Sequence, residues 1–217
     1  MEAKVKRALV FGSVPCGDWS FLEEYRRPDQ QVYCADGGLN NALAAGCKPN
    51  FVVGDWDSGG APYTGVPSVT LPVEKDMTDL QAALHYALSA GCTEFLLCGC
   101  LGGRRLDHTA FNLVLLEWLK ARGGQGVLID GDNEVRLLDR ETVTFRPARG
   151  ARYRYLSLLP LDRRVEGVSI DGVKYPLTDV AIQRGDTLTV SNQPTAQAVS
   201  VTVGDGRALL IRSEREV

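Results

Sequence analysis

The order of apolar segments along the chain constrains its fold more than any other feature of the sequence. Across residues 1–132, short apolar runs typical of strands alternate with segments that repeat apolar residues at helical spacing. The strand-like runs are residues 7–12, 31–35, 51–53, 68–71, 94–98 and 126–130. Strands that alternate with helices predict a mostly parallel sheet with helices on both of its faces.

Two helices are indicated most clearly. Residues 79–91 repeat Leu and Ala at helical spacing, with Thr78 and Gln81 placed as a capping box and Gly91 as the stop. Residues 108–124 repeat the pattern and end near Gly123. The expected buried face of this second helix consists of Phe111, Val114, Leu115, Trp118 and Leu119.

The pattern changes from residue 133. Residues 133–217 are rich in Val, Thr, Leu and Tyr, with short turn clusters between apolar runs and no helical periodicity. We therefore expect two domains, an α/β domain over residues 1–132 and a smaller, sandwich-like all-β domain over residues 133–217. The segment 203–207, "VGDGR", stands between two strand-like runs and predicts a hairpin turn.

Charge and composition narrow the functional classes. The net charge is −3 with a pI near 5.5, which disfavours nucleic acid as a partner because such binding needs a cationic face. No apolar run approaches the roughly 20 residues that span a bilayer, so no membrane association is expected. The six cysteines contain no CxxC pair, which favours free thiols in a reducing cytoplasm.

Aspartates gather where the predicted strands of the α/β domain end. In an open α/β sheet these strand-to-helix junctions lie at one edge, where ligands bind. We therefore expect carboxylates from distant parts of the sequence to converge at that edge. They follow four different strands and are Asp36, Asp55, Asp57, Asp76, Asp79 and Asp107.

Clustered carboxylates repel one another unless a cation lies among them, and Mg²⁺ prefers oxygen ligands. Each group alone also has a plainer explanation: a turn for Asp55 and Asp57, and helix capping for Asp76 and Asp79. Glycines and cations near the junctions suit a phosphate ligand, although no Walker A motif is present. They are Gly37, Gly38, Lys75, Gly102, Gly103, Arg104 and Arg105. His108 suits capping or the site equally, and His85 is expected to be structural.

Six ordered motifs resemble the thiamine pyrophosphokinase family, also called thiamine diphosphokinase. In the α/β part they are "ADGGLNNAL", "GDWDS", "KDMTDLQAAL" and "GGRRLDHTAFNL"; in the β part they are "GVKYPL" and "VSNQ". The resemblance covers nearly the whole chain. It implies transfer of a pyrophosphoryl group from Mg-ATP to the hydroxyl of thiamine, giving thiamine diphosphate and AMP. It also implies a homodimer with active sites at the subunit interface, between the α/β domain of one subunit and the β domain of the other.

The same resemblance implies roles for particular residues. Asp36, Asp55, Asp57 and Asp79 would hold Mg-ATP and organise the reacting phosphates, with Asp55, Asp57 and Asp79 as the metal ligands. Ser191 and Asn192 would contact thiamine. The supporting ATP and phosphate residues would be Gly37, Gly38, Lys75, Asp76, Gly103, Arg104, Arg105, Asp107 and His108.

The chain departs from the family pattern at one place and leaves two choices open. Two residues, Arg105 and Leu106, separate "GGR" from "DH" where the family has one, so either Arg104 or Arg105 is placed to reach ATP. Trp19, Trp56 and Tyr175 are the candidates for stacking on the cationic thiamine ring. Two other functions compete: another Mg-dependent hydrolase or transferase of nucleotides, and a non-catalytic sensor of thiamine or nucleotide.

Overall fold

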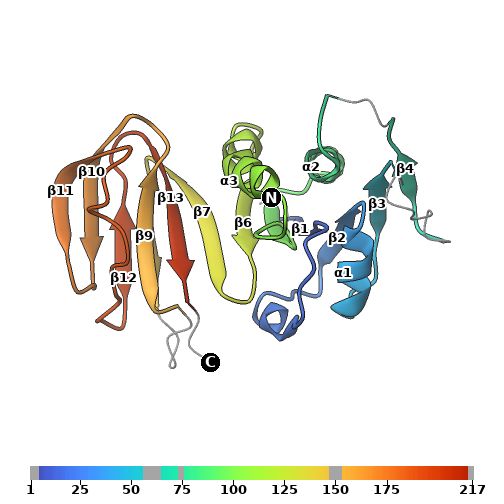
Figure 1. Ribbon diagram of the computed structural model, residues 1–217, viewed down its shortest axis with the longest axis horizontal. Helices are drawn as coiled ribbons and strands as arrows, with labels where there is room; N and C mark the ends of the chain where they lie inside the picture. The colour runs from blue at the N-terminus through green and yellow to red at the C-terminus, as the bar shows by residue number, and fades with distance from the viewer. Residues whose placement is uncertain (1–4, 56–64, 73–75, 147–152, 215–217) are drawn as a thin grey trace. The chain divides into compact units, whose positions relative to one another are not determined.

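The computed structural model describes residues 5–55, 65–72, 76–146 and 153–214. The chain divides into two compact units, residues 1–131 and residues 132–217, which are described separately below. The structure confirms the fold class expected from the sequence, with a parallel sheet and helices in the first unit and antiparallel sheets in the second (Figure 1). The functional roles expected of the two parts remain predictions.

The first unit alternates strands and helices. Its elements are β1 (Arg7–Phe11), the 3₁₀ helix η1 (Ser20–Glu24), β2 (Gln30–Ala35), α1 (Gly38–Ala44), β3 (Phe51–Gly54), β4 (Ser68–Thr70), α2 (Asp79–Ser89), β5 (Glu94–Cys98), α3 (Leu106–Lys120) and β6 (Gln125–Ile129). Every strand pairing within this unit is parallel. The sequence predicted all six strands and helices α2 and α3, and it missed η1.

The strand order determines where a ligand can enter. The strands of this unit lie in the order β4-β3-β2-β1-β5-β6, so the chain extends to one side of β1 and then returns to its other side. Phe11 at the end of β1 pairs with Cys34 of β2 and with Cys98 of β5, which brings the carboxyl ends of these three strands level. The chain changes direction across the sheet between the neighbouring strands β1 and β5. The carboxyl ends of these two strands therefore form a topological switch point, where open α/β sheets bind their ligands.

Helices cover both faces of the sheet, with α2 and α3 on one side and α1 on the other (Figure 1). The expected capping box of α2 is present: the backbone N–H of Gln81 donates to Thr78 Oγ1 at 3.2 Å. Gly91 has the left-handed φ of +86° that ends a helix. On the α1 side, η1 inserts Phe21 and Leu22 into the core.

The expected buried face of α3 is wrong in part. Leu119 is buried and Leu115 and Trp118 are half-buried, but Phe111 is 70% exposed and Val114 is 42% exposed. The face that packs on β6 instead centres on Leu116 and Leu119. Because apolar residues surround most of this helix, helical periodicity alone could not determine which side faces the sheet.

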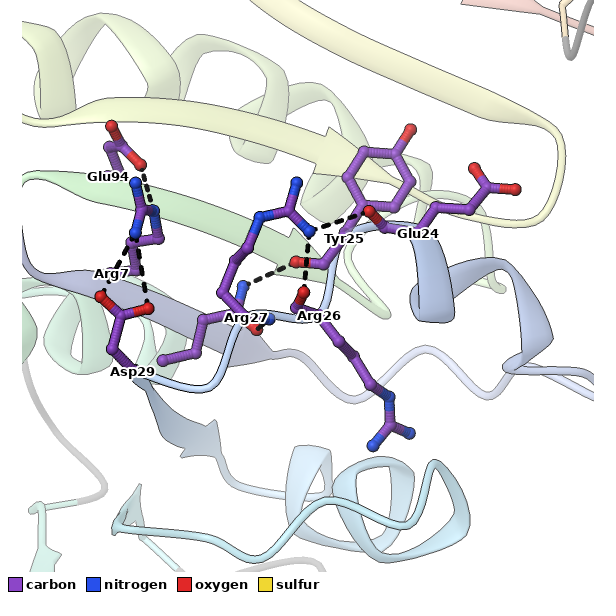
Figure 2. Close-up of polar contacts among 8 residues, drawn as sticks. Arg7, Glu24, Tyr25, Arg26, Arg27, Asp29 and Glu94 are labelled. Atoms are coloured by element: carbon purple, nitrogen blue, oxygen red, sulfur yellow. Dashed lines mark hydrogen bonds and ion pairs between the residues drawn. The ribbon is translucent and has the colours of Figure 1, made fainter. Parts of the chain in front are cut away.

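Charged side chains hold the amino-terminal edge of the same sheet together. The Arg7 guanidinium lies between two carboxylates, donating to Glu94 Oε2 at 2.7 Å and to Asp29 Oδ2 at 3.3 Å (Figure 2). Arg27 donates to the backbone carbonyls of Glu24 and Arg26. These contacts tie the loop before β2 to strands β1 and β5.

The second unit is a β-sandwich. Its strands are β7 (Asn133–Asp139), β8 (Thr142–Phe145), β9 (Tyr155–Pro160), β10 (Arg164–Asp171), β11 (Leu177–Gln183), β12 (Val199–Thr202) and β13 (Arg207–Ser213). One antiparallel sheet contains β7-β13-β9 and the other contains β11-β10-β12-β8. Leu158 and Leu210 of the first sheet share a core with Val168 and Val201 of the second.

The predicted hairpin at residues 203–207 is wrong. Strands β12 and β13 flank this segment but belong to different sheets. The segment is a corner between the sheets: Gly204 and Asp205 donate their backbone N–H groups to the carbonyl of Glu166, and Val203 donates to Glu141. A local turn signal such as "GDG" indicates a reversal of the chain but does not determine which strand the chain then joins.

Two further observations concern the whole of the described chain. All six cysteines are free thiols, and burial raises the pKa of Cys34 and of Cys100 to about 12. Among the described residues, the helices are too short or too polar for a membrane span.

Candidate active site

A cavity of about 520 Å³ opens at the carboxyl ends of the parallel strands, at the switch point between β1 and β5. Gly12 follows β1, Asp36 follows β2, Asp55 follows β3 and Gly99 follows β5, and all four line it. The remaining lining comes from the same unit: Ser13, Val14, Ala35, Thr78, Asp79, Leu80, Arg105, Asp107, His108, Phe111 and Asn112.

Four of the six predicted carboxylates meet in this cavity: Asp36, Asp55, Asp79 and Asp107. Asp36 has a left-handed φ of +46°, a conformation that is uncommon for a residue other than glycine. Its backbone N–H donates to the carbonyl of Val53 at 2.7 Å, which fixes it beside the end of β3. A strained backbone that the surroundings enforce is typical of functional positions.

The other predicted residues are distributed differently. Asp57 and Lys75 lie outside the described residues. Asp76 is exposed just before α2 and is not among the described lining residues. Four more are not among the described lining residues: Gly37, Gly38, Gly103 and Arg104.

Arg105 and Asp107 form an ion pair at the rim of the cavity. Arg105 Nε donates to Asp107 Oδ1 at 2.9 Å and Nη2 donates to Oδ2 at 2.6 Å. Chiefly because of these hydrogen bonds, the pKa of Asp107 falls to about 2. Arg105, rather than Arg104, therefore presents the guanidinium that lines the cavity.

Sequence reasoning missed the loop Gly12–Val14 and the residues Phe111 and Asn112. The glycine after the first strand was a signal for this loop, because a glycine directly after a strand of a parallel sheet often marks a close approach to a ligand. Phe111 was expected in the core. Asn112 donates its amide to the Cys100 carbonyl at 2.8 Å and so holds the loop after β5.

The donor set fits a magnesium ion that is bound together with phosphate. Carboxylate oxygens are hard ligands, and Mg²⁺ usually takes one or two of them plus substrate phosphates and water. Within the described ranges, no three His, Cys, Asp or Glu side chains are grouped closely enough to hold an ion by themselves. The carboxylates of this cavity suit an ion that arrives with its phosphate ligand.

A second cavity, of about 220 Å³, lies at the opposite, amino-terminal edge of the sheet. Arg7 and Glu94 line it, and they are paired with each other. Leu96 and Val127 add apolar surface. Among the described residues of its lining there is one carboxylate, that of Glu94, and it is bound to Arg7.

In the second unit, Asn192 is buried and its side chain is engaged. Its Oδ1 accepts from the backbone N–H groups of Tyr175 and Gln193, and its Nδ2 donates to the carbonyl of Tyr175 at 2.7 Å. Ser191 is exposed and has a φ of +57°. Asn192 therefore fixes the Tyr175 backbone in this structure, and a contact with thiamine remains a prediction.

Comparison with known proteins identifies the family to which both units belong. Residues 22–127 match the model of the thiamin pyrophosphokinase catalytic domain, and residues 142–207 match that of the thiamin pyrophosphokinase vitamin B1 binding domain. The chain belongs to the thiamine pyrophosphokinase family. A curated thiamine pyrophosphokinase of Bacillus subtilis (strain 168) is 29% identical over 188 residues, which cover 82% of this chain and 85% of that protein.

Solved structures agree with this membership. The thiamine pyrophosphokinase crystal structure from Bacillus subtilis aligns with a TM-score of 0.85 at 26% identity, covering 96% of this chain and 99% of that one. The structure from Geobacillus thermodenitrificans aligns with a TM-score of 0.80 at 28% identity, covering 97% of each chain. The thiamine pyrophosphokinase catalytic model spans the four cavity carboxylates, whereas Ser13 lies before its first matched residue.

Proposed function

We propose that this protein is a thiamine diphosphokinase, which transfers the pyrophosphoryl group of ATP to the hydroxyl of thiamine and releases AMP. The observation that carries the proposal is the convergence of Asp36, Asp55, Asp79 and Asp107 on one cavity at the switch point of the sheet. Membership of the thiamine pyrophosphokinase family supplies the substrates.

The pyrophosphoryl group can pass directly from ATP to thiamine, without a covalent enzyme intermediate. The thiamine hydroxyl oxygen attacks the β-phosphorus of ATP, and the bond from that phosphorus to the oxygen bridging to the α-phosphate breaks. AMP departs with the electron pair, and a carboxylate lining the cavity accepts the hydroxyl proton. The residues of the site contribute mainly alignment of hydroxyl and phosphorus, because phosphoryl transfer needs little covalent help from the protein.

We propose Mg²⁺ as the cofactor, held by Asp55 and Asp79 with Asp57 as a further ligand. When bound, the ion would neutralise charge on the phosphate oxygens. Arg105 lines the same cavity, and Asp107 orients its guanidinium through two hydrogen bonds. Asp36 would help to organise the reacting phosphates, while His108 lies beside Asp107 in the first turn of α3.

Solvent exposure distinguishes the aromatic residues that could stack on the thiamine ring. Trp19 is only 8% exposed and packs against Phe11 and Phe21, so its faces are covered. Trp56 lies outside the described residues. Tyr175 is 60% exposed, and Lys174 Nζ lies 5.3 Å from its ring centroid, which supports a ring face open to a cation. We assign the stacking role to Tyr175, with Asn192 holding its backbone through two hydrogen bonds.

We further propose a cytoplasmic homodimer with active sites at the subunit interface. Exposed apolar side chains on both units support association with a second copy, since monomers rarely expose many together. They are Leu106, Phe111 and Val114 in the first unit and Tyr175, Leu188 and Val190 in the second. Six free thiols favour a reducing compartment.

Identification of the products tests the function. With ATP, Mg²⁺ and thiamine, we expect thiamine diphosphate and AMP in equal amounts. Release of ADP or free phosphate would instead indicate a nucleotide hydrolase or an ordinary kinase. Binding without turnover would indicate a sensor. Running the assay with several acceptor alcohols in place of thiamine measures how strongly the site selects its acceptor.

A further inference from the structure

The loop that follows β1 places Ser13 in the active-site cavity. Ser13 lines the cavity together with Asp36 and Arg105, and its side chain is exposed. The loop precedes the residues matched by the catalytic family model. Its contribution therefore has to be judged from its own hydrogen bonds and packing.

The backbone N–H and carbonyl groups of Gly12 and Val14, the two residues that flank Ser13, all have partners. The N–H of Gly12 donates to the Cys98 carbonyl at 2.8 Å, and the N–H of Val14 donates to the Gly99 carbonyl at 2.9 Å. The carbonyls of Gly12 and Val14 both accept from Asn41 Nδ2, at 2.7 and 2.9 Å. Among the described residues, the N–H and hydroxyl of Ser13 have no such partner.

Packing holds the loop in one position. A Cβ atom at Gly12 would lie 2.6 Å from the Gly99 carbonyl oxygen, so the loops after β1 and β5 touch backbone to backbone. A Cβ at Gly37 would lie 3.3 Å from Ser13 Cβ, so the start of α1 supports the loop from the other side. Asn41 is buried, with 7% of its surface exposed, and joins α1 to both carbonyls. The backbone of Ser13, including its N–H, is therefore held in place before a ligand binds.

The charge of the cavity indicates what these donors would bind. Four carboxylates line it, and Arg105 already donates to one of them. A triphosphate in this setting needs neutral donors as well as a metal ion, because phosphate oxygens accept hydrogen bonds and cannot donate them. A backbone N–H and a hydroxyl from one residue form a compact pair for a single phosphate group.

We propose that Ser13 binds a phosphate group of ATP through its backbone N–H and its Oγ, and that Asn41 is the residue that positions the Ser13 loop. The proposal rests on the proposed function, since it assigns a further contact within the same site. It adds a phosphate-binding element at the end of β1 to the carboxylates at the ends of β2, β3 and β5 and to Arg105.

The first test compares Ser13→Ala with Ser20→Ala. Ser20 is a matched control in the next element of the chain, where its hydroxyl donates to Asp18 Oδ2 at 2.7 Å and does not line the cavity. Affinities for ATP and for inorganic triphosphate are measured by calorimetry with Mg²⁺, and KM is measured for both substrates. For Ser13→Ala we expect about tenfold weaker binding of ATP and of inorganic triphosphate, with the KM for thiamine unchanged. Ser20→Ala should match the wild type.

Two outcomes overturn the assignment of Ser13. Unchanged affinity of Ser13→Ala for both ligands would refute the contact through Ser13 Oγ and with it the two-donor site proposed here. A loss for ATP without a loss for inorganic triphosphate would place Ser13 at the nucleoside. A wild-type enzyme that binds triphosphate but makes no thiamine diphosphate would refute the proposed function and leave this phosphate contact standing.

The second test addresses the role of Asn41 with a double-mutant cycle. Asn41→Ala should raise the KM for ATP more than it lowers kcat, and combining it with Ser13→Ala should add little further loss. Full additivity would show that Asn41 does not act through Ser13. Because Asn41→Ala also destabilises a buried position, the melting temperature is measured for each variant. Asn50→Ala serves as the control, because it removes a side-chain hydrogen bond to the backbone N–H of Val32 and is not among the described lining residues.

Discussion

The two edges of the parallel sheet use charged residues in opposite ways. At the amino-terminal edge, Arg7 pairs with both Glu94 and Asp29, so each of these carboxylates has a cationic partner (Figure 2). At the carboxyl-terminal edge, Asp36, Asp55 and Asp79 line one cavity, and the described part of its lining contains one arginine. Both edges border cavities, but only the second presents an excess of carboxylates at a topological switch point.

The charged side chains at the amino-terminal edge hold elements of the fold together, whereas the carboxylates at the carboxyl-terminal edge line a cavity that a ligand can enter. At the amino-terminal edge the cation beside the carboxylates is an arginine of the protein, whereas several carboxylates that line one cavity favour the binding of an additional cation. Substitutions at the two edges should therefore have different consequences. Those at the carboxyl-terminal edge should change catalysis, and those at the amino-terminal edge should change stability.

The largest expected effect is that of Asp55→Asn. Losing a ligand of the metal–phosphate complex should lower kcat by about 100-fold or more, because metal assistance to phosphoryl transfer is worth several kcal/mol. Steady-state kinetics at saturating ATP and thiamine measures it, and circular dichroism checks that the fold is retained.

Glu94→Gln is the matched control at the other edge. It also neutralises a carboxylate at a strand end of the same sheet, and it weakens the ion pair with Arg7. Its kcat should stay within about twofold of the wild type, because this ion pair lies at the opposite edge of the sheet from the chemistry. Equal losses of kcat in both variants would remove the distinction between the two edges.

A smaller effect should distinguish the two adjacent arginines. Arg105→Gln removes the guanidinium that lines the cavity and should raise the KM for ATP about tenfold, as expected for a hydrogen bond to a charged group. Arg104→Gln changes an exposed neighbour outside the described lining and should leave that KM within about twofold. The reverse ranking would show that Arg104 turns inward when ATP binds.

The sequence was most informative where local and global signals agree. Alternating strand and helix patterns predicted the parallel sheet, and the position of aspartates after strands predicted their meeting at one edge. Both follow from elementary geometry, because consecutive parallel strands all end at the same edge. Asp36 and Asp55, 19 positions apart in the sequence, accordingly line the same cavity.

The errors came from information that a single segment does not contain. The face of α3 was misassigned because Phe111 and Val114 are as apolar as the residues that pack on β6. The turn at residues 203–207 was recognised, but strand pairing depends on distant partners such as β9 and β10. Ser13 was missed because its position depends on hydrogen bonds that its two neighbours make with Asn41, Cys98 and Gly99. These partners are distant in the sequence, so no short motif indicates the contacts.

The smallest expected effect concerns the ion pair at the cavity rim. The pKa of Asp107 is lowered from its ordinary 3.8 to about 2, chiefly by hydrogen bonds from Arg105. A carboxylate whose pKa is lower in the folded state stabilises that state above its ordinary pKa, and this contribution is lost as the pH falls from about 4 to about 2. Both side chains are exposed, so the effect on overall stability should be small.

Titration of Asp107 by carboxyl NMR tests whether the pair forms in solution. In the wild type we expect a midpoint near 2, and in Arg105→Gln a return toward 3.8. A wild-type midpoint already at 3.8 would mean that Arg105 is not bound to Asp107 and is available to a ligand without first breaking an ion pair. In that case the cavity rim would differ from the amino-terminal edge even more than the structure indicates, because the Arg7 pair would then have no counterpart at the carboxyl-terminal edge.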